Sequence, residues 1–149
     1  MNIAQKIELL YDPDTSLAYR NLQELEAFSE QENALYPYFG RFFSMLKSEK
    51  YVIRVRGFRL LCKQARWDIE NKIDQCIDEI LLALDDEKPT AVRQALKALE
   101  DVIPYKKALH ENIAAGACAI DYLSYKDTVQ GLILKDIQHL LKTIEAEKN

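Results

Sequence analysis

Glycine and proline are scarce in this 149-residue sequence, which contains four of each. Tight hairpin turns depend on these two residue types, so their scarcity disfavours a fold built from many short strands. The abundant residues, among them Ala, Leu, Glu and Lys, favour helix. We therefore predict an all-α protein, and the length predicts one domain that spans residues 1–149.

Cysteine is also rare, since Cys62, Cys76 and Cys118 are the only three. An odd number without a CxxC pair argues against a disulfide framework and against the usual spacing of zinc ligands. Residues 1–14 lack the basic segment and long apolar run of a signal peptide, and no apolar run reaches the length of a membrane span. We expect reduced, buried thiols in a cytoplasmic protein.

The sequence lacks the patterns of an organised active site. His110 and His139 lie far apart, and neither belongs to a pair with metal-ligand spacing, so we expect both on helix surfaces. The four glycines are isolated, which argues against a phosphate-cradling loop. We therefore expect no catalytic residue, no metal and no cofactor.

Acidic residues outnumber basic residues in the sequence as a whole. The formal net charge is −4, whereas dedicated nucleic-acid binders are usually basic. One stretch departs from this balance, KYVIRVRGFRLLCKQARW at residues 50–67, with the cations Lys50, Arg54, Arg56, Arg59, Lys63 and Arg66. It is either a helix that binds nucleic acid or one helix of a packed scaffold.

Turn-forming residues recur at short intervals and divide the chain into segments with helical periodicity. We expect eight helices, at residues 2–10, 15–29, 34–47, 51–66, 70–84, 89–102, 105–117 and 126–146. The connections are short, so consecutive helices should pack as antiparallel pairs, giving about four helical hairpins.

Part of the sequence repeats. The segment IRVRGFRLL (53–61) aligns with AVRQALKAL (91–99) at an offset of 38 residues, and Gly57 falls on Ala95. The segment TVQGLILKDI (128–137) is a third copy. Periods of this length are typical of helical-hairpin solenoids. Gly57 lies within the apolar surface of its helix, where a missing side chain lets another helix approach closely.

Both aligned segments resemble the second helices of HEAT-like (armadillo-type) repeats, since each follows an acidic–basic turn. The resemblance implies a right-handed α-α superhelix of about four HEAT-like hairpins, whose second helices line a concave face. It also implies that Arg54 is structural and reaches a carboxylate of an adjacent repeat, for which Asp85 and Asp86 are candidates. Gly57 and Ala95 would be structural as well.

The chain also resembles a group of small uncharacterised bacterial proteins that carry the label SufBD. The similar segments are IELLYDPDTSLAYRNLQELE, ARWDIENKID and YKDTVQGLILKDI. The label implies no mechanism here, because the iron–sulfur assembly scaffolds of that name are large β-rich proteins.

A helical wheel places four cations on one charged face, opposite the apolar surface: Arg56, Arg59, Lys63 and Arg66. One interpretation is a face that is solvated or paired with the many carboxylates of residues 68–87. The other is a binding surface, because Arg20, Arg93 and Lys97 would extend these cations into a stripe along the concave face. Such a stripe suits phosphates or an acidic peptide.

Trp67 ends the basic segment and also has two interpretations. An exposed indole beside Arg66 would anchor a ligand, whereas a packed indole would cap the hydrophobic layer between two repeats. The sequence favours the packed indole without excluding the anchor.

The expected function is that of a non-catalytic protein- or peptide-interaction module that uses the concave face. The alternative is a nucleic-acid-binding protein, related in fold to the HEAT-like DNA alkylation-repair glycosylases. The candidate binding residues are Arg56, Arg59, Lys63, Arg66, Trp67, Arg93 and Lys97. The sequence leaves the partner and the oligomeric state open.

Overall fold

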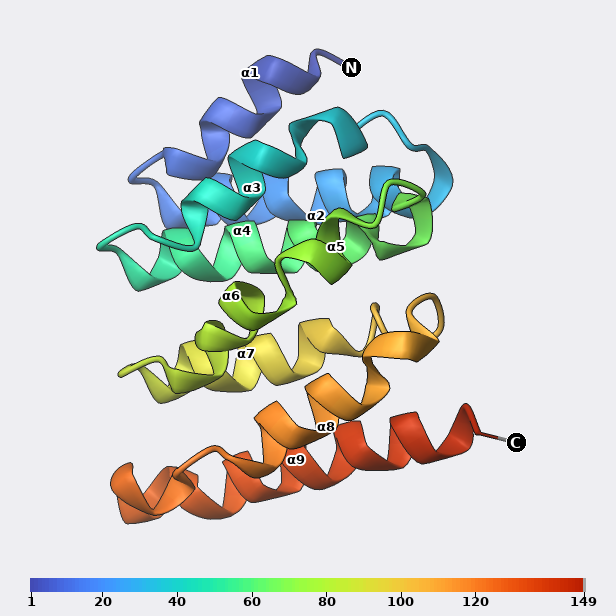
Figure 1. The fold of residues 1–149 in the computed structure, drawn as a ribbon. Coiled ribbons are helices and arrows are strands. Elements are labelled where there is room, and N and C mark those ends of the chain that lie inside the picture. Colours follow the sequence, from blue (N-terminus) through green and yellow to red (C-terminus); the bar gives the residue numbers. More distant parts are fainter. Residues whose placement is uncertain (149) are drawn as a thin grey trace.

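The computed structural model describes residues 1–148, which form an all-helical protein without a β-strand (Figure 1). The expected all-α fold is therefore confirmed. The described part of the chain contains nine α-helices: α1 (Ile3–Glu8), α2 (Thr15–Gln31), α3 (Phe39–Met45), α4 (Tyr51–Lys63), α5 (Lys72–Gln75), α6 (Ile77–Leu81), α7 (Pro89–Leu99), α8 (His110–Cys118) and α9 (Asp127–Ala146). Short 3-10 segments extend or connect them: η1 (Leu9–Tyr11), η2 (Tyr36–Tyr38), η3 (Gln64–Trp67), η4 (Leu82–Asp85), η5 (Lys107–Leu109) and η6 (Tyr122–Ser124). Among these helices, none is both long and apolar enough to cross a membrane.

Helices α2, α4, α7 and α9 form a layer in which each helix contacts the next, and we call this the second-helix layer. Helix α3 packs on α4, and α8 packs on α9. In the same way η1 packs on α2, and η4 packs on α7. Figure 1 shows the resulting pairs stacked one after another, from the N-terminal end of the chain to the C-terminal end.

The helix expected at residues 70–84 is broken into α5, α6 and η4. Asn71 has a left-handed backbone conformation (φ 56°) directly before α5, and Cys76 (φ −113°, ψ 13°) separates α5 from α6. The carboxylate of Asp68 accepts hydrogen bonds from the first two backbone N–H groups of α5 and so caps its start. The chain therefore restarts its helix after Asp68 instead of running through from residue 70.

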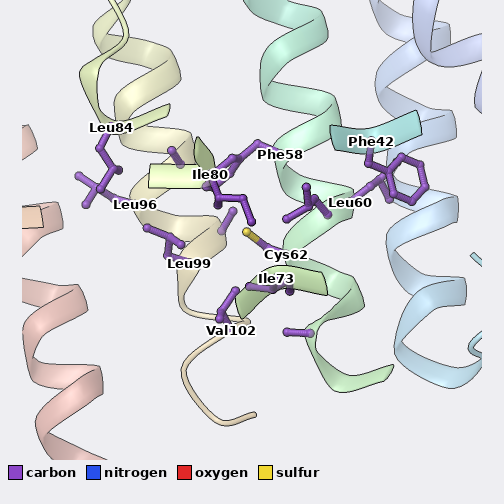
Figure 2. Packing of buried hydrophobic residues seen from close by; sticks show 14 of the residues in the cluster. Phe42, Phe58, Leu60, Cys62, Ile73, Ile80, Leu84, Leu96, Leu99 and Val102 are labelled. Carbon is purple, nitrogen blue, oxygen red and sulfur yellow. The ribbon is translucent and has the colours of Figure 1, made fainter. Parts of the chain in front are cut away.

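Apolar side chains of α4, α6, η4 and α7 pack against one another in a buried cluster (Figure 2). Phe58, Ile80 and Leu96 are each at most 2% exposed. Full burial of one such side chain contributes about 1.5–3 kcal/mol, so this cluster supplies much of the free energy that holds the pairs together. Helix α7 is buried on two sides because it packs between α4 and α9.

Helix α3 lies directly against α4 at Gly57. A Cβ atom at this position would lie 2.5 Å from Cβ of Met45 and 2.9 Å from the carbonyl oxygen of Phe42, both closer than van der Waals contact. A backbone oxygen cannot move aside by a change of rotamer, so a larger residue would push the two helices apart. At the aligned position of α7, Ala95 is 3% exposed and its methyl group is accommodated.

We predict that Gly57→Ala lowers the free energy of unfolding by about 1–3 kcal/mol, because overpacking outweighs a gain of about 1 kcal/mol in helix propensity. Gly131→Ala is the matched control, since Gly131 lies in α9 with nothing within 4 Å of an added Cβ. The control should gain up to about 1 kcal/mol. Urea denaturation measures both, and a Gly57→Ala protein as stable as the wild type would contradict the close contact.

Candidate functional site

Two adjoining hollows cross the second-helix layer. The first, of about 430 Å³, lies between α2, α4 and α7, and the second, of about 390 Å³, lies between α7 and α9. Thr90 and Gln94 of α7 line both hollows, so the two meet at this helix. We call the combined hollow the second-helix groove, whose other lining residues are Thr15, Ser16, Tyr19, Leu22, Val52, Val55, Arg56, Arg59, Arg93, Leu96, Lys97, Glu100, Asp136 and His139.

Arg59 of α4 binds Glu26 of α2 through two parallel hydrogen bonds. Its Nε lies 3.0 Å from Oε2, and its Nη2 lies 2.7 Å from Oε1. The guanidinium also lies 5.6 Å from the ring centroid of Tyr19. Burial alone would lower the pKa of Arg59, but the hydrogen bond and the charge of Glu26 outweigh it, so the pKa is raised. Arg59 is thus a fixed bridge between α2 and α4.

Lys63 repeats this arrangement one helical turn later. Its Nζ lies 2.7 Å from Oε1 of Glu30 on α2 and 3.4 Å from Oδ1 of Asp101, which follows α7. Glu26 and Glu30 are four residues apart, as are Arg59 and Lys63, so each pair presents its charges on one helix face. The hydrogen bond and charge of Lys63 lower the pKa of Glu30. The ammonium of Lys63 therefore ties α4 to α2 and to the end of α7.

An ion pair joins α7 to α9, and a further contact joins α9 to the residue after α7. Arg93 Nε lies 2.7 Å from Oδ2 of Asp136, and the imidazole Nδ1 of His139 lies 2.9 Å from Oε1 of Glu100. Lys97 is different, because it is exposed and belongs to no ion pair among residues 1–148. The second-helix groove therefore combines charges of both signs, and two of its cations, Arg59 and Arg93, already contact a carboxylate.

Arg56 does not lie on the solvated face where the helical wheel places it. The residue is 7% exposed, and its Nη1 donates a hydrogen bond of 2.7 Å to the carbonyl oxygen of Leu10. Segment η1 packs on α4 and covers this side chain, which a wheel of one helix cannot reveal. Burial lowers the pKa of Arg56. The side chain is therefore bound to the backbone of η1 and is not an accessible binding residue.

Arg66 and Trp67 lie at the carboxyl end of α2. Arg66 Nη1 lies 3.4 Å from the carbonyl oxygen of Glu30, and its guanidinium lies 5.4 Å from the ring centroid of Tyr105. Trp67 is half-buried and donates from Nε1 to the carbonyl oxygen of Ser29, at 2.7 Å. Neither residue lines the second-helix groove, and the indole contact favours packing over a free anchor.

Arg54 holds the turn before α7. Its Nε lies 2.8 Å from Oδ2 of Asp86, and its Nη2 lies 3.0 Å from Oδ1, so Asp86 is the carboxylate it contacts. Its Nη1 donates to the carbonyl oxygens of Ser48 and Glu49. Burial would raise the pKa of Asp86, but hydrogen bonds from Arg54 and from the backbone N–H of Lys88 outweigh it, and the pKa is lowered.

A buried polar cluster around Asp68 was not predicted from the sequence. Tyr36 donates to Oδ1 of Asp68 at 2.5 Å, and Lys106 Nζ lies 3.1 Å from Oδ2 of Asp68 and 2.7 Å from Oδ1 of Asp74. Burial raises the pKa of Tyr36. Burial would also raise the pKa of Asp68, but its four hydrogen bonds outweigh this effect and lower it. In the sequence, Asp68 is one of the many carboxylates of residues 68–87, and no local pattern links it to Lys106.

His110 corrects a further expectation. It lies not on a helix surface but buried, at 7% exposure, with Nε2 2.7 Å from the carbonyl oxygen of Ile103. The first turn of α8 folds back onto the preceding segment, which hides the ring. Within residues 1–148, no group of three or more His, Cys, Asp or Glu side chains is placed to hold a metal ion.

Comparison of the chain with protein-family models, with curated proteins and with solved structures finds no significant match. The HEAT-like resemblance therefore depends on the repeated segments at residues 53–61 and 91–99.

We predict that Asp86→Asn lowers the free energy of unfolding by about 1–3 kcal/mol at pH 7, because the charged acceptor of Arg54 is lost. The pKa of Asp86 is lower in the folded protein than its value of about 3.9 in the unfolded chain, so the ionised carboxylate stabilises the fold above that pH. This contribution disappears as the pH falls through the pKa of the folded state. The difference between the wild type and the variant should therefore shrink below about pH 4.

Urea denaturation between pH 7 and pH 2 measures this difference. Asp121→Asn is the control, because Asp121 is exposed and its side chain makes no hydrogen bond to residues 1–148. A stability difference for Asp86→Asn that stays constant over the whole range would contradict the assigned role.

Proposed function

We propose that this protein is a non-catalytic interaction module that binds a protein or peptide partner in the second-helix groove. In this proposal α1–α2, α3–α4, α5/α6–α7 and α8–α9 are four HEAT-like hairpins of a right-handed α-α superhelix, with the second-helix layer on its concave side. The serial contacts within that layer support the arrangement. The repeated segments at residues 53–61 and 91–99 support it as well. The expectation of buried thiols is wrong for Cys118, which is exposed; its free thiol fits the reducing cytoplasm.

The observation that carries the proposal is the charge balance of the groove. Arg59 and Arg93 each contact a carboxylate at 2.7 Å, so neither presents a free positive charge. Between them lie the amide of Gln94 and the hydroxyl of Thr90, which both donate and accept hydrogen bonds. A surface of this mixed character matches a polypeptide, which also carries both kinds of group.

The same balance disfavours nucleic acid as the partner. Phosphate binding draws its affinity from cations that replace condensed counterions. Here a phosphate would have to displace Glu26 from Arg59 and Asp136 from Arg93. Lys97 and the exposed Arg20 remain as cations outside any ion pair of residues 1–148, which is a weak basis for a phosphate track.

We predict that Thr90→Trp abolishes partner capture, because an indole at the point where the two hollows meet blocks the groove. Thr128→Trp is the matched control, since both threonines are exposed second residues of a helix and Thr128 lies outside the groove. Affinity capture from an extract of the source cells, read by mass spectrometry, compares the two variants with the wild type. Thermal melts establish that both are folded.

A polypeptide lost with Thr90→Trp and retained with Thr128→Trp is the expected result. Capture of nucleic acid alone, lost with Thr90→Trp and weakening steeply with salt, would replace the proposal with the nucleic-acid alternative. Equal recovery with both variants would refute the groove as the binding surface.

A further inference from the structure

A second pocket lies between the α3–α4 hairpin and the hairpin of α6, η4 and α7, whose positions Figure 1 shows. Its volume is about 350 Å³. Val55 and Phe58 of α4 line it together with Ala91 and Ala95 of α7. The two alanines are four residues apart, so they lie on one face of α7 and leave space that larger side chains would fill.

The walls of this pocket, here called the inter-hairpin pocket, are mainly apolar. Phe43 of α3 and Leu46, the residue after α3, contribute one wall, and Leu82 and Ala83 of η4 contribute the other. Leu82 is 68% exposed, so an apolar ligand would cover a large side chain that otherwise faces water. The volume lies at the small end of the range for ligand sites and suits a group of about the size of one aromatic ring with a short side chain.

The rim of the inter-hairpin pocket carries an excess of negative charge. Arg54 is already bound to Asp86. Lys47 and Glu79 face each other at 3.9 Å, and both are more than half exposed, so they offset one another. Two exposed carboxylates remain at the mouth, those of Asp85 and Glu87, and neither forms an ion pair among residues 1–148.

The aromatic wall already contacts one cation, because the ammonium of Lys47 lies 5.5 Å from the ring centroid of Phe43. A ligand amine at the mouth would instead meet the carboxylates of Asp85 and Glu87, while its apolar body contacts the alanines beneath.

We propose that the inter-hairpin pocket binds a small organic cation, a compact apolar or aromatic body that carries one amine. This site adjoins the second-helix groove at Val55, which lines both, and it does not depend on the function proposed there. The apolar body supplies the affinity by covering the alanines and Leu82, and the amine is selected by the acidic rim.

Titration of protein labelled with ¹³C in the methyl groups of Ala, Leu and Val tests the proposal by NMR. The probes are phenethylamine, the neutral 2-phenylethanol and the anionic 3-phenylpropionate, which share one aromatic body. Phenethylamine should shift the methyl resonances of Ala91, Ala95 and Leu82. It should bind about fivefold more tightly than the alcohol, which corresponds to one favourable exposed ion pair, and the carboxylate should bind most weakly.

Two sets of variants separate the apolar and charged contributions. Ala95→Leu fills the pocket and should abolish the shifts, whereas Ala27→Leu on the exposed side of α2 should preserve them. Ala83→Leu fills the pocket from the more open wall and replaces Ala95→Leu if that variant does not fold. The double variant Asp85→Asn, Glu87→Gln should remove the preference for the amine.

The charge control is the double variant Glu32→Gln, Glu111→Gln, since both residues are exposed and lie outside the pocket. It should bind phenethylamine as the wild type does. Absence of shifts at Ala91, Ala95 and Leu82, or unchanged binding in the filled variants, would overturn the site. Equal affinity for amine, alcohol and carboxylate would overturn the assignment of a cation.

Discussion

Every cation of α4 contacts oxygen atoms that lie outside this helix, and the arrangement of the helices depends on these contacts. Arg59 and Lys63 reach carboxylates of α2, at 2.7 Å in each case. Arg56 reaches the end of η1, and Arg54 reaches the turn that precedes α7. The most basic stretch of the sequence is therefore the part of the protein that joins its hairpins.

These contacts set geometry more than total stability. The apolar cluster between α4, α6 and α7 supplies the larger free energy, because it buries many side chains at about 1.5–3 kcal/mol each. Burying an ion pair carries a desolvation cost that offsets much of its attraction. A bidentate pair such as Arg59–Glu26 fixes the relative position of two helices, because it holds α2 and α4 in one register. The charge balance of the second-helix groove follows from the same pairs, and the proposal of a polypeptide partner depends on it.

The sequence predicted what depends on local pattern. Helical periodicity and scarce glycine led to the all-α fold, and the position of Gly57 in an apolar surface pointed to a site of close helix packing. Two features were missed because they depend on contacts between segments far apart in the chain. The helical wheel placed Arg56 in solvent, because it could not show that Leu10 of η1, 46 residues earlier, covers that face. The cluster of Asp68 with Lys106 likewise joins distant residues. The broken helix near Asn71 and the buried His110 instead depend on local contacts, of Asp68 with the start of α5 and of His110 with Ile103.

A double-mutant cycle on Glu26 and Arg59 tests the central claim most directly. The variants Glu26→Gln, Arg59→Met and the combination are compared with the wild type by urea denaturation at pH 7 and low salt. If Arg59 is a structural bridge, the coupling energy is about 1 kcal/mol or more, within the range for residues of one buried network. A coupling energy near zero would mean that the basic residues of α4 do not hold the hairpins together, and would contradict the account.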